Sequence, residues 1–492
     1  AAANNLTQTG NNNTLTVDQQ NASTVGVPQA SQHYMLYGPY AVTDYSLGVD
    51  QNGDYNAVDL TQDGGILEQI QQNATAGASI TKTTNQLVVD QATDFAGGAF
   101  IGSVQQTYTD PTGAAAKNVV TINQTAKFSD GNYYHPDVVQ AVVQKGTHNG
   151  LDIQQLDSNQ YIVEAIQDGS GNIGSIHEGL AGGGSSNSFV NTFEQKGDGN
   201  TGQITMTGNN DGSGLWKTVI VGTPPHPVSI YPNALASGAP DASLFQLGTG
   251  NQANLLFSGD NNAFGVKQDG MQNNVGGIVV SGDGNAIGIY QHSDGNVIVL
   301  AEVTGDQNDI GLVQDGMMNN IDAATTASNS SIWVKELGSH NQIKLRQGGS
   351  GNTITSNNTG DRNNLDIEQD WAATGSGNSV SINITGSDNN NYPTTAAITG
   401  AAMLTRDVIR TALSSSSFGQ GDLYQEGSGN SMTFTVLSNL NVFAAYQNGT
   451  GNSINGNVNT GTGNQAVVSQ IGNNNSTTYT QSGSGNNIGV TQ

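Results

Sequence analysis

Apolar and polar residues alternate with a period of two along most of this chain. The alternation falls in a seven-residue motif, Asn-x-Φ-x-Φ-x-Gln, where Φ is apolar. A period of two predicts β-strands with one buried face, and here that face would carry Asn, two apolar residues and Gln. Copies of the motif are Asn13 to Gln19, Asn56 to Gln62, Asn262 to Gln268, Asn285 to Gln291, Asn308 to Gln314, Asn341 to Gln347, Asn363 to Gln369, Asn464 to Gln470 and Asn486 to Gln492.

The segments between the predicted strands are as regular as the strands. Many of the Gln residues open an arc of the form Gln-x-Gly-x-x-Asn, as in Gln268 to Asn273, and a second arc reads Ser/Thr-Gly-x-x-Asn, as in Ser281 to Asn285. Gly adopts positive φ without a steric cost, and Asn and Asp tolerate it, so each arc is a predicted tight turn. One arc of each kind closes a unit of 22 or 23 residues.

A unit of this length cannot bury its own apolar face, so such units are stable only when they are stacked. Two short strands and two tight arcs per unit predict an all-β fold, a flattened β-solenoid. Stacked rungs would place Asn over Asn and Gln over Gln at the strand spacing of about 4.8 Å. The amide side chains of the motif can then hydrogen-bond along the stack in ladders, which satisfies polar groups at inward positions.

Composition and charge fit a thin-cored solenoid and exclude several other classes. Only 35% of the residues are hydrophobic and 11% are charged, and there is no cysteine for disulfides or thiolate metal sites. The net charge of −26 argues against nucleic acid or an anionic membrane as a partner. No apolar run approaches the roughly 20 residues that span a bilayer, so membrane insertion is not expected. The start at Ala1, without Met, fits a mature form from which an export signal was removed, and predicts a secreted or cell-surface location.

The repeat resembles the curlin repeat of curli-type bacterial fibre subunits. The arc Gln, the Gly two positions later, the following Asn and the terminal Gln all match, most closely over 244–389 and 423–492 and less regularly over 1–215. The resemblance implies secretion, assembly outside the cell into amyloid-like fibres, and a role in biofilm matrix and adhesion. The implied partner is a second copy of the chain, with a nucleator, a secretion channel and matrix polysaccharide as further candidates.

Insertions interrupt the repeats and divide the predicted solenoid. Irregular repeats occupy 1–215, regular repeats 242–390 and C-terminal repeats 421–492. A helix is expected only at about 399–413, with Leu404, Val408 and Leu413 near one face. The insertions are interpreted as loops that cover an edge or flank; alternatively they make lateral contacts or a recognition surface. They lie at 20–44, 92–117, 125–137, 209–241 and 391–420.

We find no pattern that predicts catalysis or a cofactor. The segment Gly169 to Gly174 fits G-x-G-x-x-G but is an ordinary Gln arc without a βαβ context. The carboxylate or basic clusters of polysaccharide-cleaving β-helices are missing as well, so an enzyme is not expected. Histidines are scattered, at His33, His135, His148, His177, His226, His292 and His340.

Four aspartates, Asp260, Asp283, Asp306 and Asp361, are expected in one arc slot of successive rungs. Carboxylates about 5 Å apart repel weakly in water, so a tolerated solvent-facing row is the simpler interpretation. Weak Ca²⁺ binding by oxygens of adjacent rungs is the alternative, and no metal ligand is predicted.

The sequence leaves two hypotheses for the function of the chain. In the first, the chain is a subunit that polymerises head-to-tail through terminal rungs, because open strands invite pairing and no capping segment is evident. In the second, it is a monomeric surface adhesin whose insertions bind a glycan or a cell surface. The residues expected to carry self-assembly are Asn4, Leu6 and Gln8 at one end and Asn486, Ile488, Val490 and Gln492 at the other.

Overall fold

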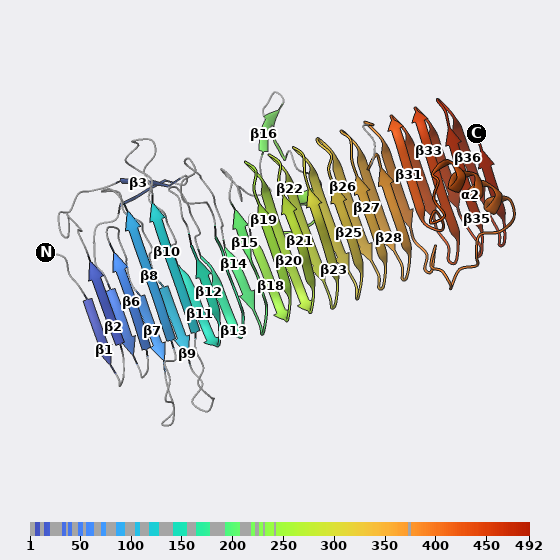
Figure 1. Cartoon of the computed structure of the whole chain (residues 1–492). Coiled ribbons are helices and arrows are strands. Elements are labelled where there is room, and N and C mark those ends of the chain that lie inside the picture. The colour runs from blue at the N-terminus through green and yellow to red at the C-terminus, as the bar shows by residue number, and fades with distance from the viewer. Residues whose placement is uncertain are drawn as a thin grey trace. The chain divides into compact units, whose positions relative to one another are not determined.

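A computed structural model gives the fold of the chain (Figure 1). It divides into two compact units, Ala1–Gly214 with Asp241–Asn262 and Leu215–Pro240 with Ala263–Gln492, and we describe each unit by itself. Side chains are described for Gln106, for 118–122 and for most described residues from 141 onward. The residues that the structure describes are 5–9, 14–19, 32–35, 38–41, 48–52, 56–62, 70–74, 85–93, 104–108, 118–126, 141–154, 164–177, 192–206, 218–221, 226–229, 232–240, 243–371 and 375–492.

The second unit is a parallel β-solenoid, as the alternation predicts. Each rung places one strand in each of two parallel sheets, which we call the even and odd sheets after their strand numbers (Figure 1). The even sheet contains β20 (Ala263–Met271), β22 (Ala286–His292), β24 (Asp309–Asp315), β26 (Ser331–Leu337), β28 (Thr353–Thr359), β30 (Ser379–Ile384), β32 (Ser431–Val436), β34 (Ser453–Val458) and β36 (Ser476–Gln481). The odd sheet contains β21 (Asn274–Val280), β23 (Val297–Val303), β25 (Asn320–Thr325), β27 (Gln342–Gln347), β29 (Asn364–Gln369), β31 (Asp422–Ser428), β33 (Val442–Thr450), β35 (Gln465–Ile471) and β37 (Asn487–Thr491).

The core is the space between the two sheets. In β27, Ile343, Leu345 and Gln347 are buried while the residues between them are not, and β29 repeats the pattern one rung later. The two strands pair in register, Ile343 with Leu365 and Gln347 with Gln369. Burying one such aliphatic side chain contributes about 1.5–3 kcal/mol, so a rung is stabilised by few apolar side chains and depends on its neighbours.

Glycine at the arcs is required by both backbone angle and space. Gly316 has a φ of 132°, and a Cβ placed there would lie 1.9 Å from the carbonyl oxygen of Gly338 in the next rung. Gly338 in turn faces the carbonyl oxygen of Gly360, so the arc glycines form a column in which side chains do not fit.

The first unit has the same parallel, in-register organisation. One sheet runs through β1 (Asn5–Thr9), β5 (Gly48–Asn52), β7 (Ile70–Ala74), β9 (Val104–Tyr108), β11 (Val142–Thr147), β13 (Ile166–Ser170), β14 (Phe193–Lys196) and β18 (Leu244–Thr249). Its partner strands are β2 (Thr14–Gln19), β6 (Asn56–Gln62), β8 (Asn85–Thr93), β10 (Asn118–Ala126) and β12 (Gly150–Ile153), followed by β15 (Ile204–Met206) and β19 (Gln252–Phe257).

Two of the expected insertions in this unit need comment. The segment 92–117 is not wholly an insertion, because β9 lies inside it and pairs with β7 and β11. Its Gln106 is buried and accepts a hydrogen bond from Gln144, although the sequence around it lacks the full motif. The segment 20–44 contains an antiparallel hairpin of β3 (Gln32–Met35) and β4 (Gly38–Ala41).

The insertion 209–241 contributes an antiparallel hairpin, β16 (Thr218–Val221) with β17 (His226–Ser229), and a one-turn helix, α1 (Pro232–Ala236), that the alternation did not predict. The backbone N–H groups of Asn233 and Ala234 each donate to the carboxylate of Asp309, at 2.8 Å. Gly288 and Gly311 allow α1 to approach the sheet closely. A Cβ would lie 2.0 Å from a backbone oxygen of α1 at Gly288 and 2.2 Å from one at Gly311. The helix is therefore seated on the outer face of the even sheet.

We expect Asp309→Ala to release α1 while leaving the solenoid folded. The change removes the acceptor of two backbone N–H groups, that of Ala234 buried and that of Asn233 partly buried, and a buried unpaired group costs about 1–3 kcal/mol. Hydrogen exchange should then rise by orders of magnitude at 233–237, while protection in β22 and β24 stays as in the parent. Equal loss of protection in the helix and in the strands would contradict this view of α1 as a separable attachment.

The helix expected at about 399–413 is confirmed as α2 (Gly400–Ala412), but its packing face differs from the expectation. Leu404 and Val408 are 66% and 42% exposed, whereas Leu413 packs against the core as expected. The buried residues of the helix are Ala402, Thr405 and Ile409. The start of α2 turns the small residues Ala402 and Thr405 to the sheet because it lies directly on the outer face of β35 and β37, where Gly489 would meet the oxygen of Ala401 if it carried a Cβ. Contact distance, and not hydrophobicity alone, selects the buried face.

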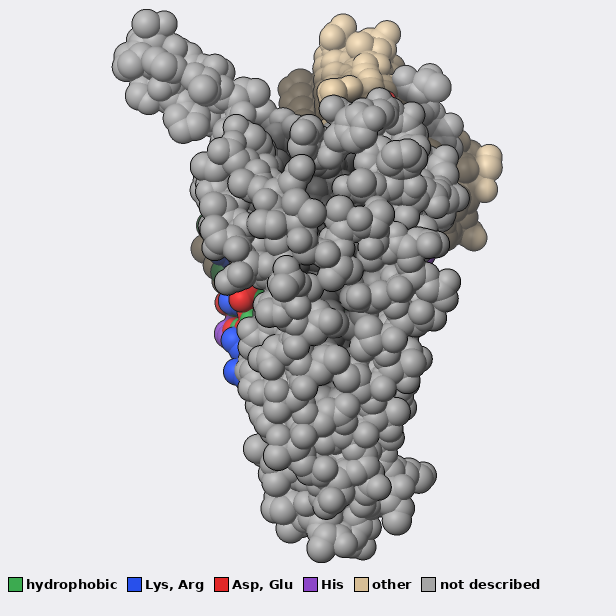
Figure 2. Space-filling view, turned by 90° about the vertical axis from the view of Figure 1, so that its left-hand side faces the viewer, with side chains coloured by type: hydrophobic (Ala, Val, Ile, Leu, Met, Phe, Trp, Pro, Cys, Tyr) green, Lys and Arg blue, Asp and Glu red, His purple; other side chains and the backbone are tan. Residues whose placement is uncertain are grey.

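Two side chains of the odd sheet hold the start of α2. Gln465 Oε1 accepts from the backbone N–H of Thr399, and Asn487 Oδ1 accepts from that of Ala402, both at 2.8 Å. Both insertions with a described helix thus cover a flank, as the simpler interpretation expected. Among the described residues, no helix is long and apolar enough to cross a membrane. In the view of Figure 2, a small group of charged and His side chains of the described residues lies at the left margin.

Candidate functional site: the amide ladders

The first Gln ladder of the second unit runs through the even sheet. Gln268 Nε2 donates to Gln291 Oε1 at 2.9 Å, and Gln291 Nε2 donates to Gln314 Oε1 at 3.0 Å. Gln291 Nε2 also donates to the backbone oxygen of Asn274 in the odd sheet at 3.2 Å. Each Gln therefore bonds along the stack and across the core, which accounts for a buried amide in an apolar layer.

A second Gln ladder occupies the odd sheet and not the even one. It begins at Gln347, which donates to Gln369 at 3.1 Å, and it continues with bonds of 2.8–2.9 Å. Each step also reaches across to the even sheet, as from Gln425 Nε2 to the Ser379 oxygen at 3.2 Å. The further members are Gln425, Gln447, Gln470 and Gln492.

The expected stacking of Gln over Gln is confirmed within each ladder, but the Gln positions change sheet in the rung formed by β26 and β27. Thr325 pairs with Gln347 in the odd sheet, and Gln314 pairs with Glu336 in the even sheet. The sequence carries a signal of this exchange, because Gln347 follows Gln314 by one and a half repeat units. At the exchange two ladder oxygens, Glu336 Oε1 and Gln347 Oε1, are buried without a hydrogen-bond partner in the described part of the chain.

Asn residues form a ladder at each of the two edges. In one, the backbone N–H of each Asn donates to Oδ1 of the Asn one rung earlier, at 2.9–3.2 Å, without interruption. Its members are Asn273, Asn296, Asn319, Asn341, Asn363, Asn389, Asn441, Asn464 and Asn486. The other edge contains Asn285, Asn308, Ser330, Asn352, Asn378, Asn430, Asn452 and Asn475, with Ser330 in one Asn position.

The predicted ladder residues therefore separate into groups. Asn285 and Asn308 lie on one edge, whereas Asn341, Asn363 and Asn464 lie on the other. Asn262 is buried. For Gln19, Asn56 and Gln62 the structure describes the backbone, with Gln19 opposite Gln62. Asn13 and Asn4 lie outside the described residues, and Leu6 and Gln8 belong to β1, opposite Val49 and Gln51.

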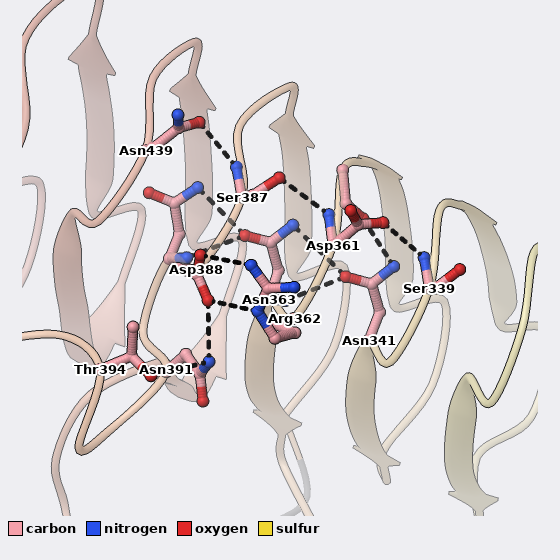
Figure 3. A network of polar contacts seen from close by, with 12 residues as sticks. Ser339, Asn341, Asp361, Arg362, Asn363, Ser387, Asp388, Asn391, Thr394 and Asn439 are labelled. Carbon is pink, nitrogen blue, oxygen red and sulfur yellow. Dashed lines mark hydrogen bonds and ion pairs between the residues drawn. The ribbon is translucent and has the colours of Figure 1, made fainter.

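The arc aspartates are more than a tolerated row. Asp306 Oδ1 accepts the backbone N–H of Asp283 at 3.0 Å, so the carboxylates bind the preceding rung. Asp361 is not in that row, which corrects the expectation, because the arcs exchange sides at β26 and β27. Figure 3 shows Asp361 in the opposite row, where it accepts from the N–H of Ser339 at 2.8 Å and donates its own N–H to Ser387 at 3.0 Å.

An ion pair reinforces the arcs at the same place. Arg362 donates to both carboxylate oxygens of Asp388 in the next rung, at 2.7 and 2.8 Å (Figure 3). The hydrogen bond from Arg362 lowers the pKa of Asp388. Because half of the Arg362 side chain is exposed, the pair adds rung-to-rung order more than stability.

Glu336 is the ladder residue that sequence reasoning missed. It is fully buried in a Gln position and accepts from Gln314 Nε2 at 3.1 Å. In the next rung it faces Asn358. Burial raises the pKa of Glu336 well above its usual value, and the hydrogen bond from Gln314 lowers it by less. The carboxyl group is therefore held towards its protonated form, which has the shape and the donor of a Gln amide.

The ladders of the second unit share one direction. Between ladder residues, each backbone N–H of the later rung donates to the side-chain oxygen of the earlier rung, Oδ1 of Asn or Oγ of Ser330. Each Gln Nε2 of the earlier rung donates to the side-chain oxygen of the later rung. At β36 and β37, Asn486 Oδ1 and Asn475 Oδ1 receive no N–H from the described residues, unlike the ladder positions before them. Gln492 Nε2 donates to the Ser476 oxygen and is exposed.

Within the described residues, no three or more His, Asp or Glu side chains are grouped so that they could hold a metal ion. No protein-family model matches the chain, and no curated protein matches it.

Proposed function

We propose that the chain is a structural subunit of an extracellular bacterial fibre of the curlin-repeat kind, which polymerises head-to-tail and serves in biofilm matrix or adhesion. The observation that carries the proposal is the common direction of the ladders in the second unit. A rung presents Asn side-chain oxygens on one side and the backbone N–H groups that bind such oxygens on the other. It is therefore complementary to a second rung of the same kind. Such a contact is heterologous and does not close, so it generates a filament.

The strand edges support the same arrangement. The N–H of Gln492 points back to Ser469, so the N–H of Thr491 points to the open side of β37, where the structure holds no strand. A strand with unpaired N–H and C=O groups on one side is a template for pairing. Ile488 and Val490 add an apolar surface, since both are half-buried while their partners Ala466 and Val468 are buried.

Proline at Thr491 tests the proposal. Thr491→Pro removes only the N–H on the open side, so the chain should fold normally while its filaments elongate at least about tenfold more slowly. Thr491→Ala, which keeps the N–H, is the matched control. Filament growth is followed by light scattering and negative-stain electron microscopy. Discrete rods from the parent protein, or equal growth of the two variants, would contradict assembly through this edge.

A further inference from the structure

The outer face of the even sheet, from β28 to β36, carries a regular array of small polar side chains. Alternation turns every second residue outward, and fifteen such positions in five rungs are Ser, Thr or Asn. We call this surface the hydroxyl–amide array. Its three columns are Thr353, Ser379, Ser431, Ser453 and Ser476; Thr355, Ser381, Thr433, Asn455 and Thr478; and Asn357, Asn383, Thr435, Asn457 and Thr480.

The array has two-dimensional order. Strands pair in register, so neighbours along a column lie about 4.8 Å apart and neighbours along a strand about 6.8 Å apart. Five rungs and three columns make a flat surface of about 20 Å by 14 Å. The backbone beneath is held by the ladders, so the side chains are presented on a rigid support.

The polar groups of the array are not used by the protein. In the part of the chain that the structure describes, none of the fifteen side chains makes a hydrogen bond to another protein group, whereas an inward ladder residue of the same rungs, such as Gln425, makes three. Most of them are exposed in β34 and β36 and partly exposed in β28. The exposed hydroxyls and amides therefore keep both donor and acceptor capacity for a ligand, whereas Oδ1 of Asn457 is buried.

The other outer face of the same rungs is different. In the odd sheet, β27 and β29 expose Lys344, Arg346, Asp366 and Glu368, and Lys344 pairs with Asp366 at 2.6 Å. Farther along, α2 covers β35 and β37. In a chain of net charge −26, a charge-free array left uncovered on one face requires a separate explanation.

One aromatic ring borders the array. Trp333 of β26 pairs with Thr355 and so heads the middle column, and its ring lies against Gly311. It is partly exposed, next to the position where Asn233 of α1 donates to Ser331. A partly exposed indole supplies an apolar surface and an N–H donor beside the hydroxyls.

We propose that the hydroxyl–amide array binds the flat, uncharged face of an extended polysaccharide. The lack of charge disfavours phosphates and ionic partners, and the lack of large apolar side chains disfavours a protein interface or lipid. A flat surface does not enclose a small ligand. A neutral glycan in an extended, sheet-forming state instead presents repeating hydroxyls, and many weak contacts act together on a rigid support. This inference does not depend on polymerisation of the chain.

The test uses the full chain with two insoluble probes, microcrystalline cellulose and chitin, in co-sedimentation. Thr433→Glu with Asn455→Glu places two carboxylates in adjacent rungs of the array, at exposed and paired positions. The matched control, Asn320→Glu with Gln342→Glu, adds the same charge at exposed, paired positions of the odd sheet. Circular dichroism checks that both remain folded.

We expect the parent and the control to bind at least one probe, and the array variant to bind at least about tenfold more weakly, because carboxylates without partners oppose a neutral surface. Absence of parent binding to both probes overturns the proposal, as does equal loss in the two variants. If the array variant instead loses only self-association, scored without polysaccharide in the same samples, the face is a contact between copies and the proposal is wrong. Filaments counted by microscopy report separately on the fibre proposal.

Discussion

Replacing Gln425 with leucine should destabilise the rungs around it by about 2–6 kcal/mol. Gln425 accepts from Gln369 Nε2 and donates to Gln447 Oε1, both at 2.8 Å, and it is buried. Leucine leaves one N–H of Gln369 and the oxygen of Gln447 without partners, and each buried unpaired group costs about 1–3 kcal/mol. It also removes the cross-core bond to the Ser379 oxygen. Hydrogen exchange of amides in β31, β33 and β35 measures the loss as a lower free energy of local opening.

A second substitution makes the prediction specific to a ladder. Adding Gln447→Leu again leaves two ladder groups unpaired, the N–H of Gln369 and the oxygen of Gln470, because the bond between the two replaced residues disappears with both partners. It also removes one more cross-core bond, from Gln447 Nε2 to the Ser431 oxygen, so the double variant should lose clearly less stability than the sum of the two single variants. Gln342→Leu, at an exposed outward position of β27, is the control and should change little. Additive losses at 425 and 447 would mean that the two amides act independently.

Glu336→Gln should stabilise the solenoid at neutral pH and remove part of its pH dependence. Burial raises the pKa of Glu336 in the folded chain well above the value near 4.3–4.5 of an unfolded Glu, so the fold binds a proton that the unfolded chain has released. Stability from this group is complete below the unfolded pKa. It is lost by about 1.4 kcal/mol per pH unit above that value, until the folded pKa is passed.

The difference between parent and variant isolates this group from other carboxyls. Burial also raises the pKa of Asp422, to about 7, and that group acts in the same direction in both proteins. The stability difference should be small near pH 4 and should grow as the pH rises to 7, in urea unfolding or hydrogen exchange around β24–β28. Glu336→Leu should lose the same pH dependence without the gain, because the amide of Gln314 then lacks its acceptor. A pH-independent difference for Glu336→Gln would show that the carboxyl is ionised in the fold.

The local sequence of the Gln motifs was sufficient to predict which residues of a rung face inward. It was not sufficient to predict which of the two sheets each strand joins. The alternation identified inward Gln291, Gln314, Gln347 and Gln369 correctly, and the structure buries all four. Whether two of them share a ladder depends on which sheet each strand joins, and that is a property of the stack. Gln314 and Gln347 are both inward, yet they end in opposite sheets and Glu336 closes the first ladder.

Sequence by itself determined the features that repeat: strands of period two, arcs with glycine, a rung of 22 or 23 residues and the helix at about 399–413. These follow from short-range rules of side-chain alternation and backbone angle, which act within a few residues. Tertiary structure decided the features that join distant residues. These are the change of sheet of the Gln ladder next to Glu336 and the hydrogen bonds of the arc aspartates to the backbone of the neighbouring rung. They also include the attachment of α1 to Asp309 and of α2 to Asn487. These features depend on which rungs are neighbours in the stack. A single repeat cannot satisfy the hydrogen bonds of its buried amides, so the stacking of neighbouring rungs determines the contacts.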